Sequence, residues 1–188
     1  MRHGFKAQAE RLSLELRAEQ SLTASCKLLP RVFLASIGIT IWEPKEIPGI
    51  DHAHVIQLTE TDPDSWSGCT IKENGHTAII INPTHPITRQ ANTLMHEWSH
   101  IKLRHKPNRV DRSPNGLLLL SDYPKDIEDE ADWLAGALLL PREGILQSRK
   151  QGLTAERIAQ HYGVSKDLTN WRLRMTGVNK QVSASRRY

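Results

Sequence analysis

The chain has 188 residues, of which 38% are hydrophobic and 24% are charged, and its formal net charge is +4. It contains no long apolar run, low-complexity tract or internal repeat, so we expect one globular domain rather than a membrane-spanning or fibrous protein. Residues 1–19 are charged throughout and lack the apolar core of a signal peptide, which predicts a cytoplasmic location. Cys26 and Cys69 form no C-x-x-C motif, which argues against a disulfide framework or a thiolate zinc site.

The N-terminal region is predicted to contain two helices and one strand. Apolar residues spaced for a helix from Phe5 to Leu16 predict a first helix that ends near Gln20. A second helix is expected over Pro30–Ser36, because proline suits a first turn and Gly38 suits the left-handed residue that closes one. Residues 39–42 predict a strand and residues 43–51 a loop, whereas residues 53–58 fit either helix or strand.

Two short β-rich runs follow, at residues 67–71 and 77–82. They are separated by Glu73-Asn74-Gly75, and Asn-Gly between two such runs predicts a β-hairpin. The hairpin has two equally supported roles. An exposed edge can hold an extended peptide by main-chain hydrogen bonds, or the hairpin can simply pack beneath the next helix.

Residues 87–106 predict a helix with His96-Glu97-Trp98-Ser99-His100 at its centre. An apolar stripe at Ile87, Ala91, Leu94, Met95, Trp98 and Ile101 has helical spacing. Two histidines four residues apart lie one turn above each other, so both rings can converge on one ion. In H-E-x-x-H helices the two imidazoles bind zinc and the glutamate acts as a general base toward water. The alternative is an amphipathic helix whose histidines have no ligand role, and the zinc interpretation requires a third ligand.

A helix over residues 126–140 offers that ligand. Residues 107–124 are predicted to be mostly loop, and Asp126 then caps a helix that stops before Pro141. Glu128 and Asp132 lie on a line apart from the apolar stripe. One carboxylate could complete a two-histidine zinc site and the second could orient a liganding imidazole, although acidic helix starts are also common without a metal.

Three segments together resemble the ImmA/IrrE family of zinc metallo-endopeptidases: IIINPTHPITRQANTL, HEWSH and EDEADWLAGALLLP. Family members carry E-x-x-A-(N/D)-x-F-A-x-x-L-L-x-P on the later helix, and Glu128, Ala131, Asp132, Ala135 and Pro141 fall on it, with Leu134 where Phe is usual. The resemblance implies His96, His100 and Glu128 as Zn²⁺ ligands, Glu97 as the general base and Asp132 as a supporting carboxylate. Glu130 is the alternative third ligand, because the alignment of the acidic run can slip by two positions.

The resemblance implies an α+β, zincin-like fold that is mostly helical, with a small, mainly antiparallel three-stranded sheet beside the H-E-x-x-H helix. We expect residues 1–150 to form the metallopeptidase domain, residues 151–178 a helix-turn-helix-like pair packed on it, and residues 179–188 a flexible basic tail. The family is typically encoded beside helix-turn-helix repressors, and several members cleave that repressor. The resemblance therefore implies such a repressor as the substrate.

The C-terminal segment supports a competing interpretation. Residues 154–165 predict a short helix, a glycine turn and a new cap at Ser165, which is typical of a helix-turn-helix. Basic residues, including Lys166, Arg172 and Arg174, could contact DNA phosphates. We favour packing of these helices through Ile158, Leu168, Trp171 and Leu173 instead.

Three functional hypotheses follow. The chain is a zinc endopeptidase, a helix-turn-helix DNA-binding regulator with a vestigial or structural zinc helix, or a module that binds a partner without cutting it. The first is favoured. A peptidase also needs a donor for the oxyanion, for which His105, Tyr123, Tyr162 and Arg172 are candidates.

Overall fold

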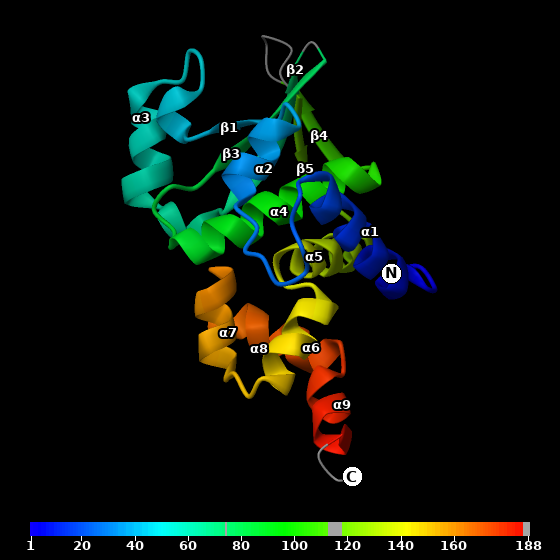
Figure 1. Cartoon of the computed structure of the whole chain (residues 1–188). Coiled ribbons are helices and arrows are strands. Elements are labelled where there is room, and N and C mark those ends of the chain that lie inside the picture. The colour runs from blue at the N-terminus through cyan, green and yellow to red at the C-terminus, as the bar shows by residue number, and fades with distance from the viewer. Residues whose placement is uncertain (74, 113–117, 186–188) are drawn as a thin grey trace. The chain divides into compact units, whose positions relative to one another are not determined.

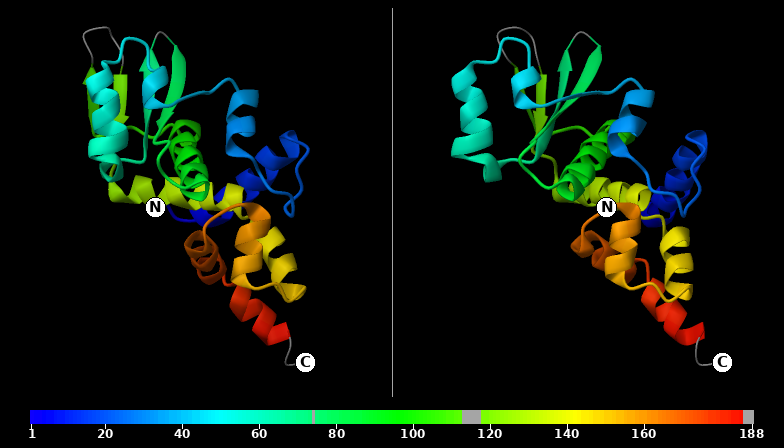
Figure 2. Two further views of the ribbon diagram at one scale, coloured as in Figure 1. Left: turned by 90° about the vertical axis from the view of Figure 1, so that its left-hand side faces the viewer. Right: turned by 60° about the vertical axis from the view of Figure 1, so that its left-hand side comes forward.

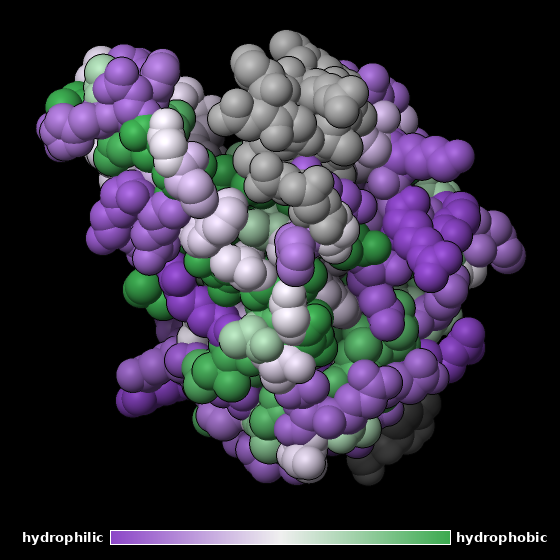
Figure 3. Space-filling view, turned by 90° about the horizontal axis from the view of Figure 1, so that it is seen from above, coloured by the Kyte–Doolittle hydropathy of each residue, from purple (hydrophilic) through white to green (hydrophobic). Residues whose placement is uncertain are grey.

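The computed structural model describes residues 1–73, 75–112 and 118–185 and divides into two compact units. The sheet unit is Leu29–Ala131, and the helical unit combines Met1–Leu28 with Asp132–Tyr188. The boundary falls within helix α5 (Lys125–Leu139), whose first turns belong to the sheet unit. Among the described residues, no helix is long and apolar enough to cross a membrane. On the face shown in Figure 3, hydrophilic and apolar residues are mixed.

The sheet unit is built on a mixed sheet with the strand order β1-β3-β2-β5-β4. The strands are β1 (Thr40–Trp42), β2 (Gly68–Glu73), β3 (His76–Ile81), β4 (Arg109–Arg112) and β5 (Leu118–Ser121). Only the β1–β3 pair is parallel among them. The register from Gly68↔Ile81 to Glu73↔His76 confirms the predicted hairpin, in which Gly75 has a φ of 82° and Asn74 lies outside the described residues.

The predicted α+β class is confirmed, but the expectation of three strands was wrong. Strands β4 and β5 form in the segment 107–124, which was predicted to be mostly loop. Strand β5 pairs with the edge of β2, and β4 pairs with β5. Their backbone hydrogen bonds come from this tertiary pairing, which local propensity does not reveal.

Helix α4 (Ile87–Leu103) carries the H-E-x-x-H motif and packs on β2 and β3, with α2 (Pro30–Ser36) against it (Figures 1 and 2). Phe33 and Trp98 meet edge to face with ring centroids 5.0 Å apart. Most of the predicted apolar stripe is buried, but Ile87 is 74% exposed because it lies in the first turn.

Helix α3 (His52–Ile56) forms in the segment that the sequence left open. A short helical turn precedes it at Pro44–Glu46, and two more follow it at Gln57–Thr61 and Pro63–Ser65.

The helical unit contains α1 (Phe5–Glu19), the end of α5, α6 (Arg142–Lys150), α7 (Ala155–Tyr162), α8 (Lys166–Met175) and α9 (Val178–Ser185). Of the four residues expected to pack, Ile158 and Leu173 are buried in this unit and Leu168 and Trp171 are half-buried. Helix α9 occupies most of the segment predicted as a flexible tail. It packs against α6 and buries Val178 and Val182, which explains its order; residues 186–188 lie outside the described residues.

Two fully buried arginines donate hydrogen bonds to carbonyl groups at the C-terminal end of α5. Arg17 donates to the carbonyl of Leu138 at 2.5 Å, and Arg172 donates to the carbonyl of Leu140 at 2.9 and 3.0 Å. Arg172 also pairs with both carboxylate oxygens of Glu10 at 2.9 and 3.0 Å. The last carbonyls of a helix have no partner within the helix, so these guanidinium groups satisfy them and neutralise the negative end of the dipole. Arg172 therefore has a structural role, not the DNA-binding or oxyanion-binding role considered from the sequence.

Candidate metal centre

Three side chains from two helices converge in the sheet unit. His96 and His100 lie one turn apart on α4, and their Nε2 atoms are 3.1 Å apart. Glu128, in the first turns of α5, places Oε2 at 3.1 Å from Nε2 of His96 and Oε1 at 3.7 Å from Nε2 of His100. The structure thus brings together all three residues predicted as ligands.

The spacing of these atoms suits a small tetrahedral cation. Zinc–ligand bonds of about 2.0–2.1 Å place any two ligand atoms of a tetrahedron roughly 3.3 Å apart. The three observed separations, 3.1, 3.1 and 3.7 Å, bracket that value. Two imidazoles and one carboxylate are a donor set that zinc accepts in catalytic sites, which keep a fourth position open.

Burial differs among the three side chains. The side chain of His100 is 2% exposed, whereas those of His96 and Glu128 are 20% and 38% exposed. Burial, followed by the nearby charges of His96 and His105, lowers the pKa of His100 to about 3. His100 is therefore neutral at physiological pH, which is the form that binds a metal. The cluster is therefore open to solvent on the side of His96 and Glu128.

Glu97 lies beside this cluster and is held by a residue that sequence reasoning missed. Burial raises the pKa of the Glu97 carboxyl, whereas His96 and a hydrogen bond from Thr70 act in the opposite direction. Thr70 is fully buried on β2, and its Oγ1 donates to Oε2 of Glu97 at 2.8 Å. Nothing in the local sequence around Thr70 indicates this contact, because it depends on how β2 packs against α4.

Tyr123 covers the second histidine. Its ring stacks on that of His100 with centroids 3.8 Å apart and an interplanar angle of 26°. Burial and the carboxylates of Glu97 and Glu128 raise the pKa of its phenol to about 12. Among the oxyanion candidates, Tyr123 thus lies at the cluster, whereas Tyr162 donates to the carbonyl of Ala24 in the core of the helical unit.

His105 and Glu130 occupy the other side of His100. Nδ1 of His105 is 3.1 Å from Nδ1 of His100, and Nε2 of His105 is 3.5 Å from Oε2 of Glu130. Glu130, the alternative third ligand, therefore faces His105, while Glu128 faces the Nε2 atoms. Asp132 is exposed in the helical unit, and its supporting role stays a prediction.

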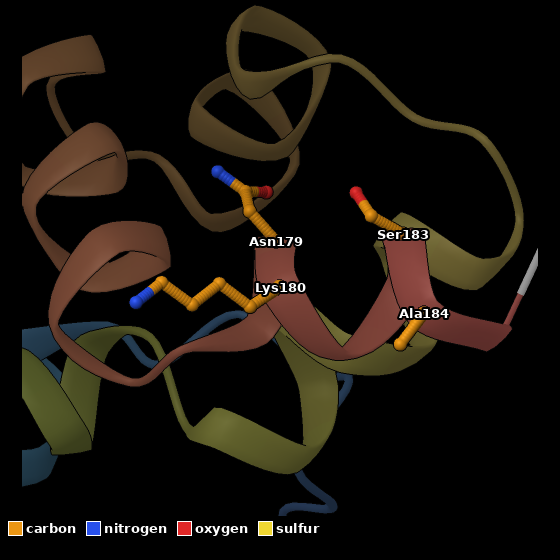
Figure 4. A pocket seen from close by; sticks show the side chains of 4 residues that line it. All are labelled: Asn179, Lys180, Ser183 and Ala184. Carbon is orange, nitrogen blue, oxygen red and sulfur yellow. The ribbon is translucent and has the colours of Figure 1, made fainter.

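Two cavities differ in chemistry. One, of about 150 Å³, adjoins the cluster and is lined by Lys72, His100, Ile101, Arg104, His105 and Tyr123. The other lies along α9 and is lined by Asn179, Lys180, Ser183 and Ala184 (Figure 4). These four residues include no side chain of the usual metal-ligating types. The candidate chemistry therefore lies in the sheet unit.

Comparison with known families agrees with this location. The model of the M78 peptidases, described as the IrrE N-terminal-like domain, matches residues 53–174, which include α4 and α5. A comparison with curated proteins finds no match.

Proposed function

Because the chain belongs to the IrrE N-terminal-like family of M78 peptidases, we propose that it is a zincin-like, zinc-dependent endopeptidase. The observation that carries the proposal is the triangle of His96 Nε2, His100 Nε2 and the Glu128 carboxylate, whose edges match a tetrahedral zinc site. These three residues would hold the ion. When bound, zinc supplies Lewis acidity toward water and toward the scissile peptide carbonyl.

Glu97 is the general base in this proposal. Its carboxylate accepts a proton from the attacking water and afterwards delivers it to the leaving amine. Thr70 donates to Oε2, which leaves Oε1 for the proton transfer. A buried carboxylate whose pKa is raised is a better base than one in bulk water, and the Thr70 hydrogen bond holds it in one orientation.

Tyr123 is the donor that we assign to the oxyanion. Its ring lies against His100, and the charges of Glu97 and Glu128 both act on its phenol, which supports a position near the proposed reaction centre. A neutral phenol donates one hydrogen bond, and such a donor stabilises the charge that develops on the carbonyl oxygen.

The proposed substrate is a helix-turn-helix repressor, cut in the cytoplasm. This part of the proposal comes from the resemblance of the H-E-x-x-H and E-x-x-A-D segments to repressor-cleaving peptidases. The DNA-binding alternative has weaker support, because Arg172 is buried and Lys166 pairs with Glu156 at 2.5 Å. Fewer basic side chains of α8 are then available for phosphates.

The test combines zinc content with cleavage. Protein purified without a chelator or a histidine tag is expected to hold about one zinc per chain, and Glu128→Ala is expected to lose it. Asp129→Ala is the matched control, because Asp129 lies on the same helix and pairs with Lys125. Glu97→Gln should keep the zinc and lower cleavage of the repressor encoded beside this protein by about 10²–10⁴-fold. Absence of zinc even after its addition, or full cleavage by Glu97→Gln, contradicts the proposal.

A further inference from the structure

We propose that His105 and Glu130 form a relay that fixes the tautomer and orientation of His100, and that this relay sets the zinc affinity of the site. The inference rests on the proposed zinc site and deepens it. It assigns His105 and Glu130 as positioning residues, in place of the oxyanion and ligand roles considered from the sequence.

The positions of the protons on the His100 and His105 rings follow from the atoms that each ring nitrogen faces. A neutral imidazole has one N–H and one lone pair, so two Nδ1 atoms 3.1 Å apart must act as one donor and one acceptor. The Nε2 atom of His100 faces His96 and Glu128, and its lone pair is needed for the metal. The proton of His100 therefore lies on Nδ1. His105 accepts it at Nδ1 and carries its own proton on Nε2, which faces Oε2 of Glu130 at 3.5 Å.

The backbone is shaped to place His105 there. Helix α4 ends at Leu103, and the capping residue Arg104 has left-handed dihedral angles (φ 54°, ψ 41°). Residues other than glycine rarely adopt this conformation. It turns the chain back, so that the N–H of His105 donates to the carbonyl of His100 at 3.0 Å. The two rings then lie 5.0 Å apart at 73° to each other.

Helix α5 supplies both the ligand and the end of the relay. Glu128 and Glu130 are two residues apart, so their side chains leave the helix in different directions. Glu128 reaches the Nε2 side of His100, and Glu130 reaches the histidine on its Nδ1 side. The side chains of Glu130 and His105 are 4% and 5% exposed. A buried carboxylate is costly unless a polar group lies against it, and Nε2 of His105, 3.5 Å from Oε2, is such a group.

The experiment measures zinc affinity by competition with a chromophoric chelator. His105→Leu fills the space without an acceptor, whereas His105→Gln retains an oxygen that can accept from Nδ1–H of His100. Loss of a partner that orients a metal ligand typically weakens binding by about 10–100-fold. We expect that loss for His105→Leu, a smaller loss for His105→Gln, and none for His54→Leu, an exposed histidine of the same unit. A purely structural role would not distinguish the leucine and glutamine variants, so equal affinities in these two variants overturn the relay.

The nitrogen resonances of the wild-type protein give an independent test, which does not depend on how the variants fold. In the zinc-loaded form, His100 is expected to be protonated on Nδ1 and His105 on Nε2. A proton on Nδ1 of His105 overturns the relay. Wild-type protein that binds no zinc defeats the proposed function itself, whereas tight binding by both wild type and His105→Leu defeats only the relay.

Discussion

Replacement of Thr70 by valine isolates the contact that holds the proposed general base. Valine has nearly the shape of threonine, so the fully buried site on β2 stays filled. The change removes the Oγ1 donor, which lies 2.8 Å from Oε2 of Glu97. The carboxylate of Glu97 then loses a partner in a place where water cannot easily replace it.

The size of the effect follows from the charge of the acceptor. A hydrogen bond to a charged group contributes about 1.5–3 kcal/mol. Burial already raises the pKa of the Glu97 carboxyl, and the hydrogen bond from Thr70 opposes that rise by favouring the ionised form. Loss of the hydrogen bond therefore raises this pKa further. Glu97 must be ionised to accept a proton. The acid limb of kcat/KM should therefore move to higher pH, and kcat/KM below the limb should fall by about 10–100-fold.

The assay is the pH dependence of kcat/KM for cleavage of the repressor, with zinc content measured in parallel. Thr77→Val is the matched control, because Thr77 is a half-buried threonine of the paired strand β3. We expect Thr70→Val to keep its zinc and Thr77→Val to retain the wild-type profile. If the acid limb of Thr70→Val coincides with that of the wild type, the role assigned to Thr70 is refuted.

Three further predictions concern folding. Arg172→Met should lower the free energy of unfolding by about 3–5 kcal/mol, because it leaves the carboxylate of Glu10 and the carbonyl of Leu140 without this partner; a loss below about 1 kcal/mol in urea unfolding would contradict the buried pair. Gly144→Ala should cost about 1–3 kcal/mol in the same assay, since a Cβ there would overlap Ala24 and Tyr162. In metal-free protein, the pKa of His100 is lowered to about 3. Above the unfolded pKa near 6.5, His100 is neutral in both states and does not lower the free energy of unfolding. As the pH falls from 6.5 toward 3, only the unfolded chain is protonated at this residue, so the free energy of unfolding decreases by up to about 1.4 kcal/mol per pH unit. His100→Gln should flatten this dependence.

Local sequence patterns predicted the two histidines of the site but did not decide its third ligand. The four-residue spacing of His96 and His100 predicts that both rings lie on one face of a helix, and the structure places their Nε2 atoms 3.1 Å apart. The acidic run of α5 was less decisive, because Glu128 and Glu130 are both compatible with a ligand role. The choice between them depends on the rotation of α5 about its own axis against α4, which no local pattern encodes.

Two other features, the β5–β2 pairing and the burial of Arg172, depend on contacts between distant parts of the sequence. The pairing of β5 with the edge of β2 turned a segment predicted as loop into a hairpin, because the partner strand supplied the hydrogen bonds. The basic character of Arg172 indicated a surface role, yet its guanidinium is buried against Glu10, more than a hundred residues away in the chain. Contacts over such separations are properties of packing.

The sequence by itself determined the helices α1, α2, α4, α5, α7 and α8, the β2–β3 hairpin and the two histidines whose spacing suits a metal, because periodicity, caps and short motifs are local. Only the tertiary structure decided that Thr70 would hold Glu97 and that His105 and Glu130 would lie behind His100. Threonine, histidine and glutamate are common in strands and at helix ends. Their role depends on which side chain lies opposite, and that is decided when the sheet, α4 and the first turns of α5 pack together.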